Sequence, residues 1–258
     1  MYTPLSVARL GLGSANIMPA RPGRLCAPMG FGLGRGRKLD PGAVGHFASD
    51  LPALPDDLAS DPRAGWVDPR AWFANPARPM EIEIGSGKGT FLVQQASLEP
   101  GTNFLGIERA KEFASYAADR ARRRGLCNVK VLCGDAAEFL RWRVPDGVCR
   151  VIHLYFPDPW PKARHHKRRM VQDRFLAEAH RVLGPGGELR VVTDHGGYWA
   201  WMEEHFARWC DAGHSPRFER VAFERPGSAG EGEIVGTNFE RKYRREGRPF
   251  YAVILKRA

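Results

Sequence analysis

The residues best suited to chemistry lie in one short stretch, Leu154–Met170, which reads LYFPDPWPKARHHKRRM. A single acid, Asp158, stands between two prolines directly after an apolar run that is typical of a buried strand. Trp160 follows, and then a dense group of cationic and imidazole side chains: Lys162, Arg164, His165, His166, Lys167, Arg168 and Arg169. A carboxylate on a stiff turn at a strand end suits a reactive group of an open α/β sheet, and the cations beside it suit a polyanion.

Both features also have simpler interpretations. An acid between prolines often serves only as a turn former. A basic run often covers a solvated face. The density of the cations directly after a predicted strand favours the binding interpretation.

The composition narrows the kind of partner. The 258 residues carry a formal net charge of +10, with a sequence pI near 9.7, which favours a phosphate-bearing partner or an anionic surface. No run approaches the roughly 18 apolar residues that cross a bilayer, so no membrane partner is expected. The five scattered cysteines form no C-x-x-C pair, which argues against a disulfide framework or a structural zinc site and favours the reducing cytoplasm.

The first 70 residues differ from the rest of the chain. They are rich in Gly and Pro, show weak hydrophobic periodicity and contain no acid before Asp40. No continuous apolar segment follows the start, so a secretory signal is not expected. We predict that residues 1–70 are a disordered basic arm, or in part the product of a start assigned too far upstream, with Met29 nearer the true start. The length then allows one well-buried domain over residues 71–258.

From Met80 onward the pattern alternates between strands and helices. It predicts strands at 80–84, 103–108, 128–135, 151–156 and 188–194, and helices at 90–98, 111–124, 136–143, 175–183 and 198–209. A closing pair of strands is predicted at 217–223 and 248–256, with a Gly- and Glu-rich loop over 227–236 between them. Such alternation indicates the α/β class, with a doubly wound, mostly parallel seven-stranded sheet and helices on both faces.

Acidic side chains follow four successive predicted strands: Glu83, Glu108, Asp135 and Asp158. In such a sheet the ligand lies across the carboxyl ends of the strands, so these acids are expected at one edge. Each acid alone could instead cap a helix. Four in succession favour a ligand with hydroxyls, an exocyclic amine and positive charge, groups that S-adenosylmethionine carries.

The turn after the first of these strands, G-S-G-K-G (85–89), would let a ligand approach the backbone closely at Gly85 and Gly87. Two other interpretations of this turn fail. A phosphate-binding loop of the G-x-x-x-x-G-K type needs a glycine where Ile82 stands. A dinucleotide fingerprint needs a third glycine where Thr90 or Phe91 stands.

The chain resembles the bacterial tRNA (guanine-N7-)-methyltransferases, a family with the Rossmann-like class I methyltransferase fold that modifies a variable-loop guanine. The resemblance covers about residues 80–258 and rests on these segments: E-I-G-S-G-K-G (83–89), G-I-E (106–108), G-D-A (134–136), F-P-D-P-W-P-K-A-R-H-H-K-R-R (156–169), T-D (193–194) and T-N-F-E (237–240). It implies S-adenosylmethionine as the cofactor and tRNA as the partner. We expect no obligatory protein partner.

The resemblance also assigns residues to roles. Asp158 would be catalytic, and the cofactor would be bound by Glu83, Gly85, Gly87, Glu108, Asp135 and Asp158. The substrate would be bound by Lys162, Asp194, Thr237, Asn238, Phe239 and Glu240, with residues 164–169 contacting RNA. Asn238 stands where the family often carries a basic residue.

The chemistry of the reaction agrees with these roles. Guanine N7 carries a lone pair and no proton, so the transfer needs alignment rather than a general base. We interpret Asp158 as the group that orients and electrostatically stabilises the base. Asp194 and Glu240 are candidates to read the base edge. Trp160 could stack on the base or simply pack.

Two alternatives stay open. The first is a methyltransferase of the same fold that acts on another RNA, a protein or a small molecule, which leaves the basic run without a role. The second is a non-catalytic RNA-binding module, which leaves the strand-end acids and the glycine turn without a role.

Overall fold

Eight strands and six α-helices organise the part of the chain that the structure describes. The structure, a computed structural model, describes residues 38–58, 60–61, 63–211 and 217–258, all within Arg37–Ala258, one of the two units into which the chain divides. The strands are β1 (Gly45–Phe47), β2 (Met80–Ile84), β3 (Asn103–Glu108), β4 (Val129–Cys133), β5 (Cys149–Tyr155), β6 (Leu183–Thr193), β7 (Phe218–Val221) and β8 (Tyr251–Arg257). The helices are α1 (Thr90–Leu98), α2 (Lys111–Arg123), α3 (Ala136–Arg143), α4 (Asp173–Val182), α5 (Gly196–Cys210) and α6 (Asn238–Arg245). Short 3-10 helices include η4 (Ala163–Arg168).

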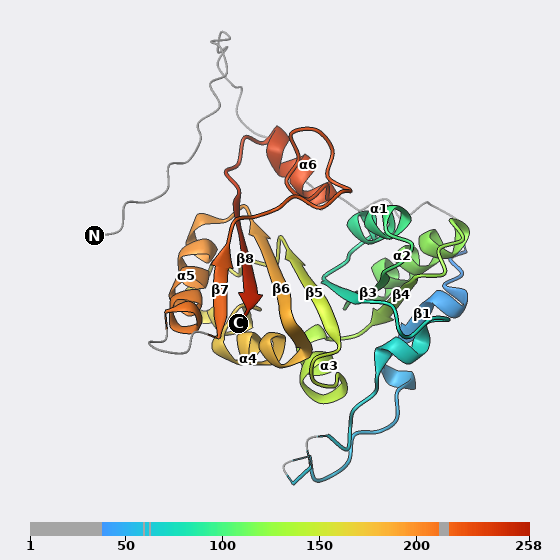
Figure 1. Cartoon of the computed structure of the whole chain (residues 1–258). Coiled ribbons are helices and arrows are strands. Elements are labelled where there is room, and N and C mark those ends of the chain that lie inside the picture. The colour runs from blue at the N-terminus through green and yellow to red at the C-terminus, as the bar shows by residue number, and fades with distance from the viewer. Residues whose placement is uncertain (1–37, 59, 62, 212–216) are drawn as a thin grey trace. The chain divides into compact units, whose positions relative to one another are not determined.

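The strands form one sheet in the order β1-β4-β3-β2-β5-β6-β8-β7 (Figure 1). All pairs from β1 to β6 are parallel, whereas β8 runs antiparallel between β6 and β7. The carboxyl ends of β2 to β6 therefore meet at one edge. None of the described helices combines the length and apolar character needed to cross a bilayer.

The two faces of the sheet bury separate cores. Met80, Ile82 and Ile84 of β2 pack in the core formed with α3, α4 and α5, while α1 and α2 bury the opposite face. Because side chains alternate along a strand, Glu81 and Glu83 point away from the first core, toward the face that carries α1. Two acids are thereby buried on the same face of one strand.

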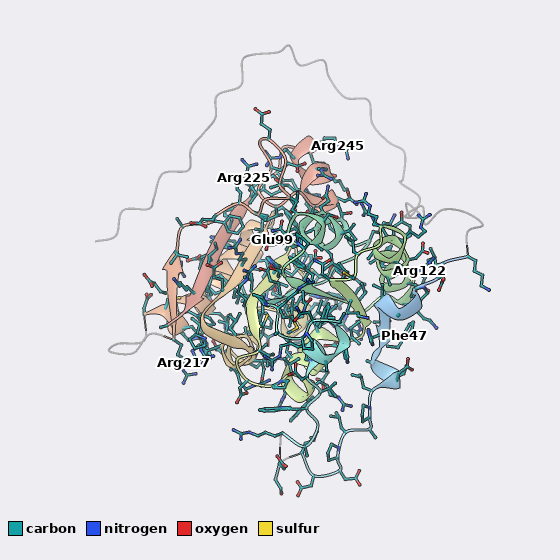
Figure 2. The ribbon with its side chains drawn as sticks, turned by 45° about the vertical axis from the view of Figure 1, so that its right-hand side comes forward. Phe47, Glu99, Arg122, Arg217, Arg225 and Arg245 are labelled. Atoms are coloured by element: carbon teal, nitrogen blue, oxygen red, sulfur yellow. The ribbon has the colours of Figure 1, made fainter. Side chains whose placement is uncertain are left out.

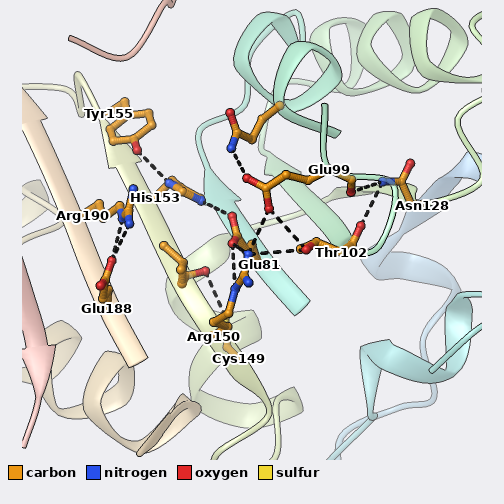
Figure 3. A network of polar contacts seen from close by, with 12 residues as sticks. Glu81, Glu99, Thr102, Asn128, Cys149, Arg150, His153, Tyr155, Glu188 and Arg190 are labelled. Atoms are coloured by element: carbon orange, nitrogen blue, oxygen red, sulfur yellow. Dashed lines mark hydrogen bonds and ion pairs between the residues drawn. The ribbon is translucent and has the colours of Figure 1, made fainter. Parts of the chain in front are cut away.

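A buried polar network joins β2 to β5 on that face (Figure 3). Glu81 is 4% exposed; its Oε2 lies 2.8 Å from His153 Nε2, and Arg150 Nε donates to its Oε1 at 3.0 Å. His153 Nδ1 lies 2.7 Å from the Tyr155 hydroxyl. Burial alone would raise the pKa of Glu81, but the hydrogen bonds and charges of His153 and Arg150 lower it to about 2. This acid is fully engaged in holding two strands together.

Helix α6 lies beyond the carboxyl ends of β5 and β6 (Figure 1). The segment before it contributes Val235, which packs with Phe91 of α1, Tyr155 of β5 and Val192 of β6 in a third small core. This core anchors the segment to the sheet. The helix is thus held next to the edge where the predicted site residues lie.

The predicted fold class is confirmed, with eight strands in place of seven. The extra strand, β1, pairs in parallel with β4, from Gly45 opposite Val131 to Phe47 opposite Cys133. It lies inside the stretch 1–70 that the sequence assigns to an arm, so the domain begins before residue 71. Three residues make no periodic pattern, and their partner strand is distant in sequence. The same stretch also forms the 3-10 helices Gly42–Val44 and Ala48–Asp50 and the start of Pro69–Trp72, which the prediction of an arm did not anticipate. Residues 1–37, 59 and 62 of the predicted arm lie outside the described residues.

Two further differences concern element bounds. Strand β6 begins at Leu183 rather than at residue 188, because Leu183 pairs with Cys149 and the next pair joins Glu188 to Val151, which leaves the G-P-G-G segment looped out of the ladder. Helix α6 was not predicted. The other predicted strands and helices agree with the structure to within a few residues at their ends.

Candidate active site

The glycine turn between β2 and α1 lies against the end of β3. Gly85 and Gly87 adopt left-handed φ values of 74° and 53°. The N–H groups of Gly85 and Ser86 donate to the Ile107 carbonyl at 2.8 and 3.2 Å, and that of Gly87 donates to Glu108 Oε2 at 2.8 Å. A Cβ at Gly85 would meet no atom within 4 Å. The turn therefore leaves open space beside the backbone at Gly85.

Glu83 is the least satisfied acid of this edge. It is 5% exposed, and its Oε2 has no hydrogen-bond partner among the described residues. Burial raises the pKa of Glu83 well above its usual range; a hydrogen bond from the Leu92 backbone opposes this, and the charge of Glu108 adds to it. The buried hydroxyl of Ser86 also lacks a partner in this part of the chain. Because Glu83 ends β2 and Ser86 belongs to the glycine turn, these two unpartnered atoms are candidates to bind a ligand at this edge.

Backbone amides hold the next two acids. Glu108 accepts N–H groups from Gly87 and Ala110, each at 2.8 Å. Asp135 caps α3, accepting the N–H groups of the second and third helical residues at 2.9 and 3.2 Å. The Gly134 N–H donates to the Glu108 carbonyl at 3.1 Å. The structure thus brings the ends of β2, β3 and β4 together, and Asp135 is in addition the helix cap that its simpler interpretation describes.

Asp158 is exposed on the turn that follows β5. The turn contains two residues with unusual backbone, Phe156 with φ of 53° and Trp160 with φ of 41°. Non-glycine residues in this region cost about 1–3 kcal/mol and cluster at functional sites. Arg169, which is 4% exposed, donates from Nε to the Pro159 carbonyl at 2.9 Å and so braces the turn.

The cations after Asp158 divide into two groups. Lys162, Arg164, Lys167 and Arg168 are exposed. Arg169 is instead buried, with its guanidinium 5.0 Å from the ring centroid of Tyr198 and 5.2 Å from that of Trp201. The predicted RNA contact by Arg169 is therefore corrected: the residue supports the Asp158 turn.

Aromatic rings pack against three side chains of the basic run. The Arg168 guanidinium lies 4.9 Å from the Trp160 ring, and His165 meets the same ring edge-on at 5.8 Å. His166 contacts Trp201 edge-on at 5.6 Å. Trp160 is thus a packing partner of η4 in this structure, which matches the packing interpretation of this residue.

The T-N-F-E motif forms the start of α6. The Thr237 hydroxyl accepts the Glu240 N–H at 3.0 Å. Glu240 is fully buried; its carboxylate accepts the N–H groups of residues 234–236 and pairs with Arg244 at 2.7 Å. The predicted reading of a base edge by Glu240 is therefore corrected, because the protein itself uses both of its oxygens. The capping box T-x-x-E was the available signal for this helix.

Of the other predicted substrate residues, Lys162 directly precedes η4, whereas Asn238 and Phe239 belong to α6 and Asp194 contacts the segment after it. Asn238 donates from Nδ2 to Thr90 Oγ1 at 2.8 Å and so links α6 to α1. Phe239 is 42% exposed. Asp194, at the end of β6, accepts a hydrogen bond from Arg248 at 2.6 Å.

Helix α6 also carries a basic surface that was not predicted. Its cations are Arg241, Lys242, Arg244 and Arg245. Figure 2 shows Arg245 and Arg225 at this end of the described unit, well separated from Arg217. The basic run after Asp158 and helix α6 are therefore both cationic segments that follow strands of the sheet.

Residues 77–253, which include the glycine turn and the acids along the carboxyl edge of the doubly wound sheet, match a family model described as a putative methyltransferase. The chain belongs to the tRNA (guanine-N7-)-methyltransferase family. A protein of that name from Nitrobacter hamburgensis is 42% identical over 179 residues, 69% of this chain and 68% of the relative. Another from Rhodopseudomonas palustris (strain BisA53) is 38% identical over 222 residues, 84% of each chain.

A solved structure is also similar, at lower identity. It is a SAM dependent methyltransferase from Aquifex aeolicus, 16% identical, with a TM-score of 0.45 over 86% of this chain and 100% of that chain.

Proposed function

We propose that this protein transfers the methyl group of S-adenosylmethionine to N7 of a guanine in the variable loop of tRNA. The observation that carries the proposal is the buried, unpartnered carboxylate oxygen of Glu83 beside the open glycine turn. The printed names of the relatives support the choice of substrate.

The residues at the edge fit S-adenosylmethionine. Its ammonium and sulfonium groups are cationic, and its ribose hydroxyls and adenine amine are hydrogen-bond donors. Glu83, Glu108 and Asp135 would hold these groups, with Gly85 and Gly87 leaving room for close approach to the backbone. When bound, the cofactor supplies an electrophilic methyl group.

On the acceptor side, the protein has to align a base. Guanine N7 has a lone pair and no proton, so no side chain has to remove one. Alignment of two reactants can supply roughly 7–11 kcal/mol of a barrier. Asp158 would orient the guanine through its N–H donors and stabilise the positive charge that develops on the ring. The strained turn suits this task because the surrounding structure fixes it.

Two cationic segments would hold the RNA backbone. The exposed cations after Asp158 belong to the segment that follows β5, and those of α6 belong to the segment that precedes β8. In the sheet, β6 lies between β5 and β8. Neutralising phosphates releases counterions and makes binding depend on salt. The cations would thus supply affinity, while the acids supply chemistry and base selection.

The direct test is methylation of unmodified tRNA by the purified protein, followed by nucleoside analysis. We expect 7-methylguanosine as the product. Asp158→Ala should lose most turnover and keep tRNA binding, whereas the matched exposed-acid control Glu231→Ala should keep both. A different methylated nucleoside, or none, would overturn the proposal.

A second test separates the cations from the chemistry. Replacing Arg164, Lys167 and Arg168 by Ala should lower the log–log salt slope of tRNA binding by roughly 0.7–0.9 for each phosphate that the variant no longer neutralises. Cofactor affinity should not change. Arg217→Ala is the control, because its guanidinium lies 4.7 Å from the ring centroid of Trp209 in the last turn of α5 and does not belong to the run. A wild-type slope in the triple variant would mean that the run is only a solvated face.

A further inference from the structure

The acid at the end of β6 already binds a flat cation. Arg248 Nη1 donates to Asp194 Oδ2 at 2.6 Å, and Arg248 Nη2 lies 2.6 Å from Glu246 Oε2. The Asp194 side chain is 11% exposed and that of Arg248 is 43% exposed. The same guanidinium carbon lies 4.1 Å from the ring centroid of Tyr243. The guanidinium is therefore held by an acid at its edge and by an aromatic ring at its face.

This arrangement adjoins the Asp158 turn. The Tyr243 ring meets Phe156, the residue with left-handed backbone before that turn, edge-on at 5.9 Å, and it lies 6.0 Å from Phe239. Burial raises the pKa of Tyr243, and the charges of Asp194 and Asp158 contribute in the same direction. Tyr243 thus lies within electrostatic reach of both acids that the reaction is expected to use.

Guanine and guanidinium share one chemical feature. The Watson–Crick edge of guanine, N1–H and the N2 amine, repeats the parallel N–H donors of a guanidinium group and suits a carboxylate. Splayed bases in RNA are also bound by stacking on aromatic side chains. A guanine paired through this edge keeps N7, on the opposite side of the purine, available for reaction.

We propose that Tyr243 is the stacking platform of the target guanine, and that Arg248 fills the place beside Asp194, the acid already expected to read the base edge, until the base displaces it. The proposal rests on the proposed function. Displacement needs only the movement of a partly exposed side chain in the segment after α6, where Gly247 already adopts left-handed φ of 68°. Once displaced, the cation is free to pair with RNA phosphate.

The test uses guanosine, which has no phosphate, as the probe for binding to the full-length protein by NMR titration. Arg248→Ala should strengthen guanosine binding severalfold, because a competing group is removed. In the Asp194→Asn background this gain should disappear. Arg225→Ala, which removes an exposed arginine of the loop before α6, should change nothing. A purely structural role for Arg248 would weaken binding instead.

Tyr243 is tested separately. Tyr243→Ala should weaken guanosine binding roughly tenfold or more, the usual effect of removing a stacking ring, and Tyr243→Phe should restore it. Because Phe keeps the ring, it separates stacking from a loss of folding. For methyl transfer to tRNA, the effect of Tyr243→Ala should fall mainly on KM.

The outcomes divide clearly. Unchanged or weaker guanosine binding in Arg248→Ala, or unchanged binding in Tyr243→Ala, overturns the inference even if the wild-type protein makes 7-methylguanosine in tRNA. A wild-type protein that methylates no tRNA guanine overturns the proposed function, and the inference with it.

Discussion

Strand β2 carries two acids on the same face, and their surroundings are opposite. Glu81 engages both oxygens with Arg150 and His153, and its pKa falls to about 2. Glu83, two residues nearer the carboxyl edge, has an oxygen without a partner among the described residues, and its pKa lies well above the usual range. Both acids are buried, so hydrogen bonding separates an acid that builds the sheet from one that is available to a ligand.

The same contrast separates two motif acids on the other side of the site. Glu240 is fully buried and accepts hydrogen bonds from three backbone amides and Arg244. Asp158 is exposed on a strained turn. Membership of a motif is therefore not evidence of contact with substrate, because the motif acid Glu240 holds the backbone of residues 234–236.

The largest effect should follow from breaking the Glu240 cluster. Glu240→Gln places an amide nitrogen against N–H donors and should lower the free energy of unfolding by about 4 kcal/mol, as when a buried ion pair loses one partner. Urea unfolding checks this. Glu231→Gln, an exposed acid of the same segment, is the control. An equally small change in both variants would contradict the structural role of Glu240.

A somewhat smaller loss should follow from Glu81→Gln. We expect about 3 kcal/mol at pH 7, because His153 and Arg150 stay buried or half-buried beside a weaker acceptor. The pKa of Glu81 is lower in the folded protein than its ordinary value of 4.5, so this stabilisation is present above pH 4.5 and fades as the pH falls toward 2. The difference between variant and wild type, measured by urea unfolding at several pH values, should therefore shrink in acid. A difference in unfolding free energy that stays constant with pH would mean that the effect of the substitution does not come from the charge of Glu81.

The smallest expected effect is the release of a proton from Glu83 when the cofactor binds. The raised pKa means that Glu83 keeps its proton at pH values where a glutamic acid is normally ionised. Because a cationic cofactor favours the ionised carboxylate, its binding should release that proton. Affinity should then strengthen with rising pH, by up to about tenfold per unit while Glu83 is protonated in the free protein. Calorimetry in buffers of different ionisation enthalpy measures the released proton. Equal proton release by wild type and Glu83→Gln would exclude Glu83 as its source.

Much of the fold could be predicted from the sequence, because periodicity and glycine punctuation are local. These signals correctly placed β2 to β5 and the acids at their ends. Strand β1 and helix α6 were not predicted: the first is three residues paired with a distant strand, and the second has a single buried residue, Glu240, and so no apolar stripe.

The roles of individual polar residues were harder to predict. Arg169 and Glu240 look like surface residues in the sequence, and only their tertiary partners bury them. Whether a carboxylate oxygen remains without a partner, as in Glu83, depends on atoms from several elements. The position of an acid at a strand end is a local property, whereas its hydrogen-bonding state is not.

The central claim is that Glu83 is held for a ligand at a cost to the fold, and one paired measurement on Glu83→Gln tests it most directly. Thermal unfolding of the free variant should give a higher Tm than wild type near neutral pH. A pKa raised by burial means that folding must either protonate Glu83 or bury its charge once the pH exceeds its ordinary value of 4.5, and Gln has neither cost. Calorimetry should show S-adenosylmethionine binding weakened by about 1.5–3 kcal/mol, the usual value of a charge-assisted hydrogen bond. A lower Tm with unchanged cofactor affinity would contradict the account.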